Sequence, residues 1–563
     1  MTERMVERMS KEQQFLVNQS MLMMDNFYDK ELDLMGSFEE DSSQHSTRSS
    51  AHYALGLLVR NETGDVERAV RVLHKVLDMQ YDAPDEIYHG TFRTRPDAIH
   101  PPAGHYAWKS FAPGTAYFLE RTFEKVSEQF IYNLQGADSI LTDRADAKRL
   151  KRLFHDAVNQ ILPPVWISYD PNWREFIACV CAIVTAEFAT LVPGTLLERM
   201  DQAMELAVQA SIDRRMSDAI PMNTNIELMH IFITHYYGHR LNRTEWISHS
   251  DEQAETFLRE FDQFGGTFAE FNTTTYYGVD LSVLGMWRKY AFTERLTDIG
   301  HRIEAGLWTN IALYYNANLE NLSGPFARAY DMEMREHSSI GVFLYLLLGE
   351  GYEHLAGINC ESGHDPLIAL VGVDVPVEAV PYFKAHQGDR LVQKQFMELC
   401  ERNEPHANRN LCTAKAWIGA NRMMGAMSGS RNTNGQMYPA TIHWQSETGE
   451  RYDLRLTRRE VGEGWNTHLR GVTFEADVTK DSLVIEVELD TEDEIEIYFE
   501  VRGPFIRQQD IIPEQWRFPG LMCDVKADAP EPSVLFYVNH AEIIYRYVPG
   551  VTANKMRFEL NIS

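Results

Sequence analysis

A cluster of polar side chains lies directly ahead of an apolar helical run that begins near residue 279. It comprises Glu270, Asn272, Tyr276 and Tyr277, together with three threonines. One Thr or Asn oxygen is enough to cap a helix, so the cluster exceeds what capping requires, and a tyrosine near a cation can act as a general acid or base. The surplus indicates a functional site. The alternative is a loop whose Thr and Asn side chains bond their own backbone.

A second group follows a Gly-Pro turn. It contains Arg328, Tyr330, Asp331, Glu333 and His337. The Arg328 guanidinium could bind a carboxylate through two parallel hydrogen bonds. Asp331 and Glu333 are two residues apart and cannot share one face of a helix. The alternative for these two acids is the first turn of a helix, where negative charge complements the helix dipole.

A third candidate is Asn225, which stands at the start of an apolar helical run and could cap it or point into a cavity. His235 and His239, at the end of the same run, have the i, i+4 spacing of a metal pair. The HExxH context is missing, and histidine is favoured at a helix C-terminus by the dipole alone. We therefore expect neither a metal nor a cofactor.

Two further segments, 167–176 and 88–97, combine aromatic residues with arginine and carboxylates. Trp173 and Arg93 are their candidates for stacking on a sugar and hydrogen-bonding its hydroxyls. Capping of the following helix is the alternative for the first segment. P-loop, GxGxxG, GxSxG and Cys-His nucleophile patterns are missing from the chain, so the sequence supports neither nucleotide binding nor acyl transfer.

The elements that must position these residues are mostly helices. Apolar periodicity predicts helices over 13–28, 52–60, 66–80, 113–134, 145–162, 175–191, 195–215, 225–235, 250–264, 279–290, 293–315, 331–348 and 392–399. The chain has no repeat of fixed period, which disfavours a solenoid and favours a bundle or a closed ring of helical hairpins.

The pattern changes near Ser428. A stretch rich in turn residues is followed by short segments of alternating β-branched and aromatic residues, which is typical of an antiparallel β-sandwich. The sequence thus predicts a mainly α protein with a β domain. We expect an N-terminal helix and linker at 1–50, a helical domain at 51–427 and a β-sandwich at 428–563.

Composition narrows the class of protein. Of the 563 residues, 44% are hydrophobic and 11% aromatic, which excludes a disordered chain, and no apolar run is long enough to span a membrane. The N-terminus lacks the apolar core of a secretory signal, and the six cysteines have no ligand spacing, so we expect a cytoplasmic protein with reduced, buried thiols. The formal net charge of −29 argues against partners that are nucleic acids or anionic membranes. It leaves room for a homo-oligomer.

Two sets of segments carry a resemblance to known proteins. The hairpin HYALGLLVRNETGDVERAVRVLHKVLDMQ, followed by HGTF, a long helical region and a β-sandwich, resembles heparinase II/III-like and chondroitin/alginate-lyase-like proteins. The segments YDPNWREF, FNTTTYYGVDL and SGPFARAYDM look closer still to a group of uncharacterised microbial proteins. The resemblance implies an (α/α) toroid of helical hairpins with a C-terminal antiparallel β-sandwich.

The same resemblance implies a reaction and roles for the candidate residues. In the lyase-like families an Asn, sometimes with Arg or Glu, neutralises a uronate carboxylate, while Tyr and His transfer the protons of a β-elimination. Pairing the carboxylate makes the adjacent carbon acid easier to ionise. Asn225 would be the neutraliser, Tyr276 or Tyr277 the acid and base, and Arg328 a further carboxylate contact. His230, His235 and His337 are candidates for the histidine.

Two other functions remain open from the sequence. An inverting glycoside hydrolase on the same toroid would need an acid and a base carboxyl group roughly 6.5–9.5 Å apart, and Glu270 with Asp331 or Glu333 is the natural pair. A non-catalytic sugar-binding protein would use the same polar clusters only to cap helices. In each case the partner is a saccharide, and a lyase acting on a uronate-containing saccharide is the first choice.

Overall fold

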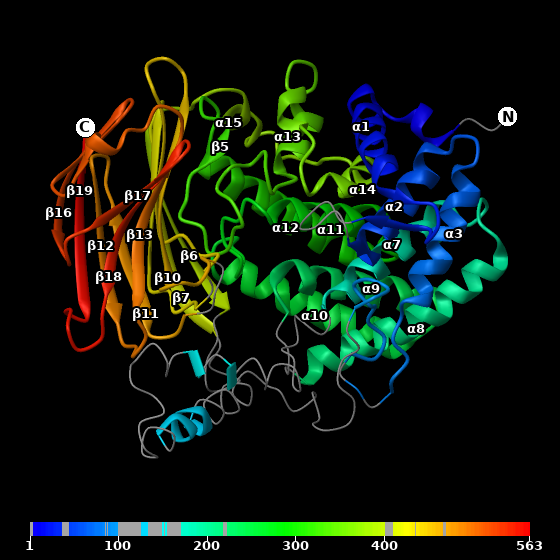
Figure 1. Cartoon of the computed structure of the whole chain (residues 1–563). Helices are drawn as coiled ribbons and strands as arrows, with labels where there is room; N and C mark the ends of the chain where they lie inside the picture. The colour runs from blue at the N-terminus through cyan, green and yellow to red at the C-terminus, as the bar shows by residue number, and fades with distance from the viewer. Residues whose placement is uncertain are drawn as a thin grey trace.

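The computed structural model describes most of the chain. The described residues are 4–36, 44–84, 86, 88–98, 125–132, 149–150, 153–154, 170–217, 222–399, 409–433, 435–465 and 469–563. They form a helical part that carries the N-terminus and a β part that carries the C-terminus, side by side (Figure 1).

Inner helices of the helical part form a closed ring. They are α2 (Thr47–Arg60), α7 (Trp173–Glu187), α9 (Thr224–Arg240), α11 (Tyr277–Tyr290) and α14 (Asp365–Val371). Each packs against the next in this order, and α14 packs back against α2. Nearly every side chain of α7, α9 and α11 is buried, as expected for helices that are apolar on all sides.

Outer helices pair with the inner ones to form hairpins. After α2, α7, α9 and α11 come α3 (Asp65–Asp78), α8 (Gly194–Ser217), α10 (Thr244–Gln263) and α12 (Glu294–Tyr314), each packed on the helix before it. The N-terminal helix α1 (Lys11–Phe27) packs on α14 and supplies its partner. The (α/α) toroid is therefore confirmed, and α1 is one of its helices, although the sequence places residues 1–50 outside it.

The β part contains two antiparallel sheets. The first has the strand order β17-β18-β13-β10-β9-β8-β7-β6, and the second has the order β11-β12-β19-β16-β15-β14. Their bounds are β6 Arg390–Leu399, β7 Arg409–Ile418, β8 Arg422–Ser428, β9 Ala440–Gln445, β10 Arg451–Glu460, β11 Val472–Val478, β12 Ser482–Leu489, β13 Ile495–Arg502, β14 Ile511–Ile512, β15 Gln515–Phe518, β16 Leu521–Asp528, β17 Ser533–Tyr537, β18 His540–Tyr547 and β19 Lys555–Ile562.

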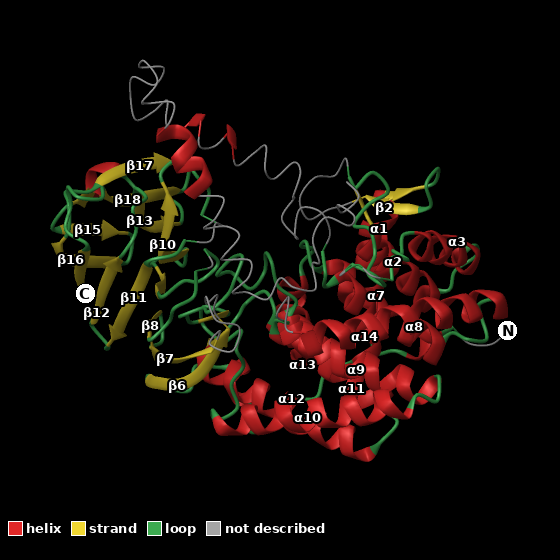
Figure 2. Cartoon of the chain, turned by 90° about the horizontal axis from the view of Figure 1, so that it is seen from below, coloured by secondary structure: helices red, strands yellow, loops and turns green. Residues whose placement is uncertain are grey.

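The two sheets meet face to face where β11 packs on β8 (Figure 2). In β12 every second residue is buried, as the alternating sequence Ser482–Leu489 predicts. The predicted antiparallel sandwich is thus confirmed.

The change from helices to strands comes earlier than the sequence indicates. The predicted helix over 392–399 is wrong, because these residues belong to β6 in the first sheet. Strands β6, β7 and β8 all begin before residue 428, so the sheet begins at Arg390 and not after Ser428. Alternate residues of β6 face solvent and give a mixed apolar pattern that also fits a short helix.

The other helix predictions differ in how well they agree with the structure. The helix expected over 331–348 is shorter, since α13 covers only Ile340–Leu348, and the short helices α14 and α15 (Val380–Lys384) were not predicted. Of the helix expected at 113–134, only 125–132 lie in the described part, and they are helical. The helix expected at 145–162 lies almost wholly outside the described residues.

A segment without long elements, 315–339, connects the ring to the first sheet. It begins with the two-residue strands β4 (Tyr315–Asn316) and β5 (Asn321–Leu322). Phe326 then forms an isolated β-bridge with Tyr438, which lies between β8 and β9, and Asp331 forms an ion pair with Arg502 of β13. Residues 323–331 are therefore held between the helical and the β part.

Two further observations concern the described residues only. None of their helices combines the length and the apolar character that crossing a bilayer requires. No disulfide joins the five cysteines among them: Cys179, Cys181, Cys412 and Cys523 are buried, whereas Cys360 is partly exposed.

Candidate active site

The inner helices bring the candidate residues to one rim of the ring. Because each inner helix is followed by an antiparallel outer partner, α2, α7, α9 and α11 run in the same direction around it. Their N-terminal ends carry Arg48, Trp173, Asn225 and Tyr277, with Tyr276 at the N-cap of α11. Helix N-termini carry partial positive charge, so this rim favours an anionic ligand even though the protein as a whole is acidic.

A buried ion pair between Glu270 and Arg328 forms the centre of the cluster. Glu270 is 4% exposed, and its Oε1 accepts a hydrogen bond from Arg328 Nη1 at 2.6 Å. Its Oε2 is 3.4 Å from the backbone N of Asn225, and its own N–H donates to Thr224 Oγ1. The Glu270 carboxylate thus joins the start of α9 to the segment 323–331.

Arg328 makes further contacts that fix its orientation. Its Nε donates to Gln436 Oε1 at 2.9 Å. Its guanidinium carbon lies 4.4 Å from the centre of the Tyr276 ring, within the range of a cation–π contact. Nη2 makes no hydrogen bond to a described residue, and 19% of the side-chain surface stays exposed. A ligand carboxylate can therefore still reach Arg328.

Tyr276 and Tyr330 form a pair of hydroxyl groups beside Arg328. The Tyr276 hydroxyl donates to the Tyr330 hydroxyl at 3.0 Å. Burial raises the pKa of Tyr276 well above its ordinary value, although the charge of Arg328 lowers it. The Tyr276 phenol is therefore protonated at neutral pH and can supply a proton through Tyr330.

His337 and Cys360 extend this group. The centres of the Tyr330 and His337 rings are 5.9 Å apart, and His337 Nδ1 lies 2.7 Å from Cys360 Sγ. His337 is half-buried, and its Nε2 makes no hydrogen bond to a described residue. The imidazole therefore lies next to the two phenols with one nitrogen available.

Asn225 has a buried amide oxygen without a partner. The residue is 3% exposed, and its Oδ1 makes no hydrogen bond to the described residues. A buried polar atom without a partner is uncommon in a folded protein. It fits a side chain whose partner is a ligand.

A second wall of the rim consists of Arg48, Trp173 and Phe176. The Arg48 guanidinium lies 5.7 Å from the centre of the Trp173 ring and 4.9 Å from that of Phe176. Phe176 stacks at 6.1 Å on His364, whose Nδ1 is 3.1 Å from Glu361 Oε2.

Glu361 connects this wall to the tyrosine group. Burial raises its pKa, but the hydrogen bond to His364 and the charges of His364, Arg48 and His337 together lower it below the ordinary value. Glu361 is therefore ionised at neutral pH and lies within electrostatic reach of Arg48 and of His337.

Arg93 lies close to this wall. Its guanidinium is 5.7 Å from the centre of the Tyr81 ring. The adjacent Thr94 carbonyl accepts a hydrogen bond from the Thr47 N–H at the start of α2, one residue before Arg48. The predicted wall residues Trp173 and Arg93 thus belong to neighbouring segments.

Tyr277 and Asn272 have structural contacts and lie apart from the tyrosine group. The Tyr277 side chain is buried, and its hydroxyl accepts a hydrogen bond from the Asn272 N–H at 2.6 Å. Asn272 has a φ of 51°, and its amide donates to the carbonyls of Ser323 and Pro325. The expectation that Tyr277 is an acid or base and that Asn272 binds substrate is therefore corrected: both hold the site loops together.

Both alternative partners of Glu270 in the predicted hydrolase pair, Asp331 and Glu333, are already bound by arginines. Both Asp331 oxygens bind Arg502, at 2.5 and 3.0 Å. Burial raises the pKa of Asp331, but the hydrogen bond and charge of Arg502 outweigh it and lower the pKa overall. Glu333 forms a two-point ion pair with Arg335. Neither carboxyl group is placed as a proton donor to a ligand.

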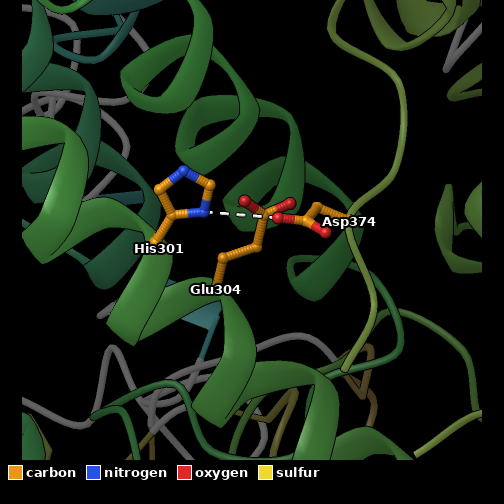
Figure 3. A group of neighbouring side chains, drawn as sticks. All are labelled: His301, Glu304 and Asp374. Atoms are coloured by element: carbon orange, nitrogen blue, oxygen red, sulfur yellow. Dashed lines mark ion pairs between the residues drawn. The ribbon is translucent and has the colours of Figure 1, made fainter. Parts of the chain in front are cut away.

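Groups of residues that could hold a metal occur elsewhere among the described residues. One is His301, Glu304 and Asp374, with His301 Nδ1 3.3 Å from Asp374 Oδ2 (Figure 3). Glu304 is already bound by Arg288 at 3.1 Å, so a cation would compete with that guanidinium. The other group, Glu500, His540 and Glu542, likewise contains acids bound by arginines.

Several site residues were not predicted from the sequence. They are Gln436, Cys360, Glu361, His364 and Arg48. Gln436 lies in the β part and reaches the site only through the tertiary fold, so no local pattern reveals it. The run Cys360-Glu361-Ser362-Gly363-His364 combines a thiol, an acid and an imidazole in five residues, and that density was the available signal.

Comparison with known proteins gives a family but no activity. A family model described as Domain of unknown function (DUF8769) matches residues 14–145 and 155–365, more than half of the chain. No curated protein matches the sequence.

Among solved structures, three matches illustrate the result. Heparinase III covers 90% of this chain and 92% of its own at 10% identity and a TM-score of 0.35. A heparan sulfate lyase HepC mutant from Pedobacter heparinus covers 90% of both chains at 8% identity and a TM-score of 0.27. Chondroitin AC lyase from Streptomyces coelicolor A3, in complex with chondroitin sulphate, covers 98% of this chain and 100% of its own at 10% identity and a TM-score of 0.30.

These matches come from the classes of protein that the sequence resemblance names. With TM-scores below 0.5, they carry no conclusion about reaction or substrate. The fold described above rests on the helices and strands of this chain.

Proposed function

The chain belongs to the family described as Domain of unknown function (DUF8769), so its activity has to be inferred from the site, and we propose that it is a lyase that cleaves a uronate-containing saccharide by β-elimination. The observation that carries the proposal is the contact between the protonated Tyr276 phenol and the Arg328 guanidinium, near Asn225, whose buried amide oxygen has no partner among the described residues.

The substrate carboxylate would be bound by Arg328 and Asn225. In β-elimination the proton on C5 leaves first, and the charge that develops spreads onto the adjacent carboxylate. Hydrogen bonds and positive charge at this carboxylate stabilise that charge. Arg328 Nη2, the Nδ2 donor of the Asn225 amide and the N-termini of α9 and α11 would supply both.

The proton transfers would use the tyrosine pair and His337. A base accepts the C5 proton, the C–H electron pair forms the C4–C5 double bond, and the C4–O bond breaks with its electrons going to the leaving oxygen. His337 Nε2 is the candidate base, and the Tyr276–Tyr330 pair the candidate acid that protonates the leaving oxygen. Tyr276 is suited to this role because its raised pKa keeps it protonated.

A glycoside hydrolase is less well supported. It would require one of the predicted carboxyl groups to be protonated and to face a ligand. Asp331 is bound by Arg502 and has a lowered pKa, and Glu333 is bound by Arg335. Glu270 already accepts hydrogen bonds from Arg328 Nη1 and from the backbone N–H of Asn225.

The test is to incubate the protein with a panel of short uronate-containing oligosaccharides and to measure ultraviolet absorption. A lyase product absorbs because its new double bond is conjugated with the carboxylate, whereas a hydrolysis product does not. We expect absorbing product with the wild type, product formed about 10²-fold or more slowly with Tyr276→Phe, and partial activity with Glu270→Gln.

Two outcomes would contradict the proposal. New reducing ends without absorption, lost in Glu270→Gln, would indicate a hydrolase. No turnover of any panel member, together with unchanged ligand affinity after combined substitution of Tyr276, Tyr330 and Arg328, would indicate polar clusters with only a structural role.

A further inference from the structure

Cys360 contacts His337, the candidate base, but the proposed reaction gives the thiol itself no role. Cys360 precedes the short helix η4 (Ser362–His364), and His337 lies just before α13, so the contact joins two loops of the rim. Sγ is 2.7 Å from His337 Nδ1 and 3.6 Å from the carbonyl oxygen of Glu336. Both distances are within hydrogen-bonding reach for sulfur.

The Cys360 thiol can donate its one proton either to the Glu336 carbonyl or to His337 Nδ1. This choice determines which ring nitrogen of a neutral His337 carries the imidazole proton. If the thiol donates to the Glu336 carbonyl, Sγ can only accept a hydrogen bond from His337. Nδ1 then carries the proton of the neutral imidazole, and Nε2 presents a lone pair. If the thiol donates to Nδ1 instead, Nε2 carries the proton and cannot act as a base.

The carbonyl favours the first arrangement. A backbone carbonyl oxygen can only accept, so the 3.6 Å contact between Cys360 Sγ and the Glu336 carbonyl is a hydrogen bond only when the thiol donates to it. We propose, on the basis of the proposed function, that Cys360 is a positioning residue that holds neutral His337 with its proton on Nδ1, leaving Nε2 free to accept the C5 proton of the substrate.

The other groups near His337 form its electrostatic environment. Tyr330 lies against the ring, Glu336 is its neighbour in sequence, and Glu361 is within electrostatic reach. Behind Glu361 lie His364 and Arg48. Because these groups remain in a Cys360 variant, a change in that variant reports on the thiol.

The first experiment reads the tautomer directly and does not depend on activity. Selective ¹⁵N labelling of histidine, with His337 identified by the signals that disappear in His337→Gln, shows which ring nitrogen carries the proton. We expect Nδ1–H in the wild type and in Cys360→Ser, whose hydroxyl can also accept and donate. In Cys360→Ala we expect a shift towards Nε2–H, the form that a neutral imidazole without a partner prefers.

All variants carry Cys400→Ser, because Cys400 lies outside the described residues, whereas the remaining cysteines are buried. Should Cys360→Ala fail to fold, methyl methanethiosulfonate gives a second measurement on the folded protein. It converts the thiol to a methyl disulfide and releases methanesulfinate, which removes the S–H donor. We expect the His337 signals to change and to return after reduction with dithiothreitol.

The second experiment measures turnover. We expect Cys360→Ala to lower kcat/KM about tenfold, with KM little changed and the pH–rate profile shifted, and Cys360→Ser to restore most of the rate. Nε2–H in the wild type, or His337 signals and rates unaffected by Cys360→Ala, would overturn the inference. Nδ1–H in a wild type that forms no unsaturated product would overturn the proposed reaction and leave the tautomer assignment intact.

Discussion

Arg328 links three side chains whose positions depend on one another. Burial of the Glu270 carboxylate requires a partner, because an uncompensated buried charge is strongly destabilising. A guanidinium can bind that carboxylate, bind Gln436 with a second nitrogen and lie over the Tyr276 ring. The single side chain thus fixes the acid, the amide and the phenol.

The two adjacent tyrosines allow a matched test of the proposed acid. We expect Tyr276→Phe to lower kcat by about 10²-fold or more with little change in KM, because only the hydroxyl is lost. In Tyr277→Phe the Asn272 N–H loses its buried acceptor, so stability falls by about 1–3 kcal/mol. Its activity per folded molecule should persist. Equal loss of kcat in both variants would mean that neither hydroxyl has a chemical role.

Arg328→Lys tests the planar guanidinium separately from its charge. Lysine keeps the positive charge but cannot reach Glu270 and Gln436 together while lying on Tyr276. We expect KM for a uronate oligosaccharide to rise about tenfold, with a smaller fall in kcat. Arg335→Lys is the control, because Glu333 is the hydrogen-bond partner of Arg335 within the described part of the chain. An unchanged KM in Arg328→Lys would remove Arg328 from substrate binding.

At the scale of elements, Asn272 connects the two loops that carry the site. Its left-handed backbone turns the loop ahead of α11, and its amide binds two carbonyls of the segment that carries Arg328. This double role explains why polar residues are more numerous here than one helix cap needs.

Substitution of Asn272 separates the backbone role from the side-chain role. Asn272→Gly keeps the left-handed conformation and loses both hydrogen bonds, which should cost about 2–3 kcal/mol. Asn272→Ala loses the same bonds and also strains the backbone, so its free energy of unfolding should be about 1 kcal/mol lower again. Urea unfolding of both variants measures the two terms. Equal stability of the Gly and Ala variants would show that the backbone conformation has no cost.

The contact between the helical and the β part should depend on pH through Asp453. Burial raises the pKa of Asp453 to about 6, despite the charge of Arg502, so the folded state binds a proton that the unfolded state has lost. Stability should therefore fall as pH rises from about 4 to about 6, by about 2 kcal/mol. Asp453→Asn should lack this part of the decline, as measured by urea unfolding at a series of pH values. An identical pH dependence in Asp453→Asn and wild type would refute the assignment.

Local patterns predicted the elements that repeat and missed those that depend on distant partners. Apolar periodicity placed α9 and α11 within a few residues, because their environment is uniformly apolar. It failed for β6, whose mixed pattern is resolved only by pairing with β7. The polar surplus marked Glu270 and Tyr276, and both contact Arg328. It could not separate Tyr276 from Tyr277, since the two differ only in the direction in which the fold points their rings.

At the scale of the whole molecule, the ring is closed by residues far apart in sequence. Helix α1, near the N-terminus, packs on α14, and Gln13 donates a hydrogen bond to the Ala369 carbonyl. This pairing cannot be read from either helix alone. It lets the inner helices point their N-termini to one rim of a protein whose formal net charge is −29.

The acidic surface and the positive helix N-termini of the rim act on an anionic substrate in opposite directions. This opposition predicts an unusual salt dependence of kcat/KM. The acidic surface should repel a long polyanionic oligosaccharide, whereas the local positive end of the rim acts only at short range. Raising the ionic strength from about 10 to about 150 mM shortens the screening length from about 30 to about 8 Å. We therefore expect kcat/KM for a long uronate oligosaccharide to rise severalfold over this range.

A uronide disaccharide is the control for this measurement, because it carries few charges and should respond weakly. If kcat/KM for the long substrate falls with salt while the disaccharide is unaffected, attraction by the rim dominates at long range and the repulsion argument is wrong. If kcat/KM for the long substrate rises with salt, repulsion by the net charge limits the rate at which protein and substrate meet. The protein would then be suited to short or already cleaved chains, because each added uronate increases the repulsion that the substrate meets before it reaches Arg328.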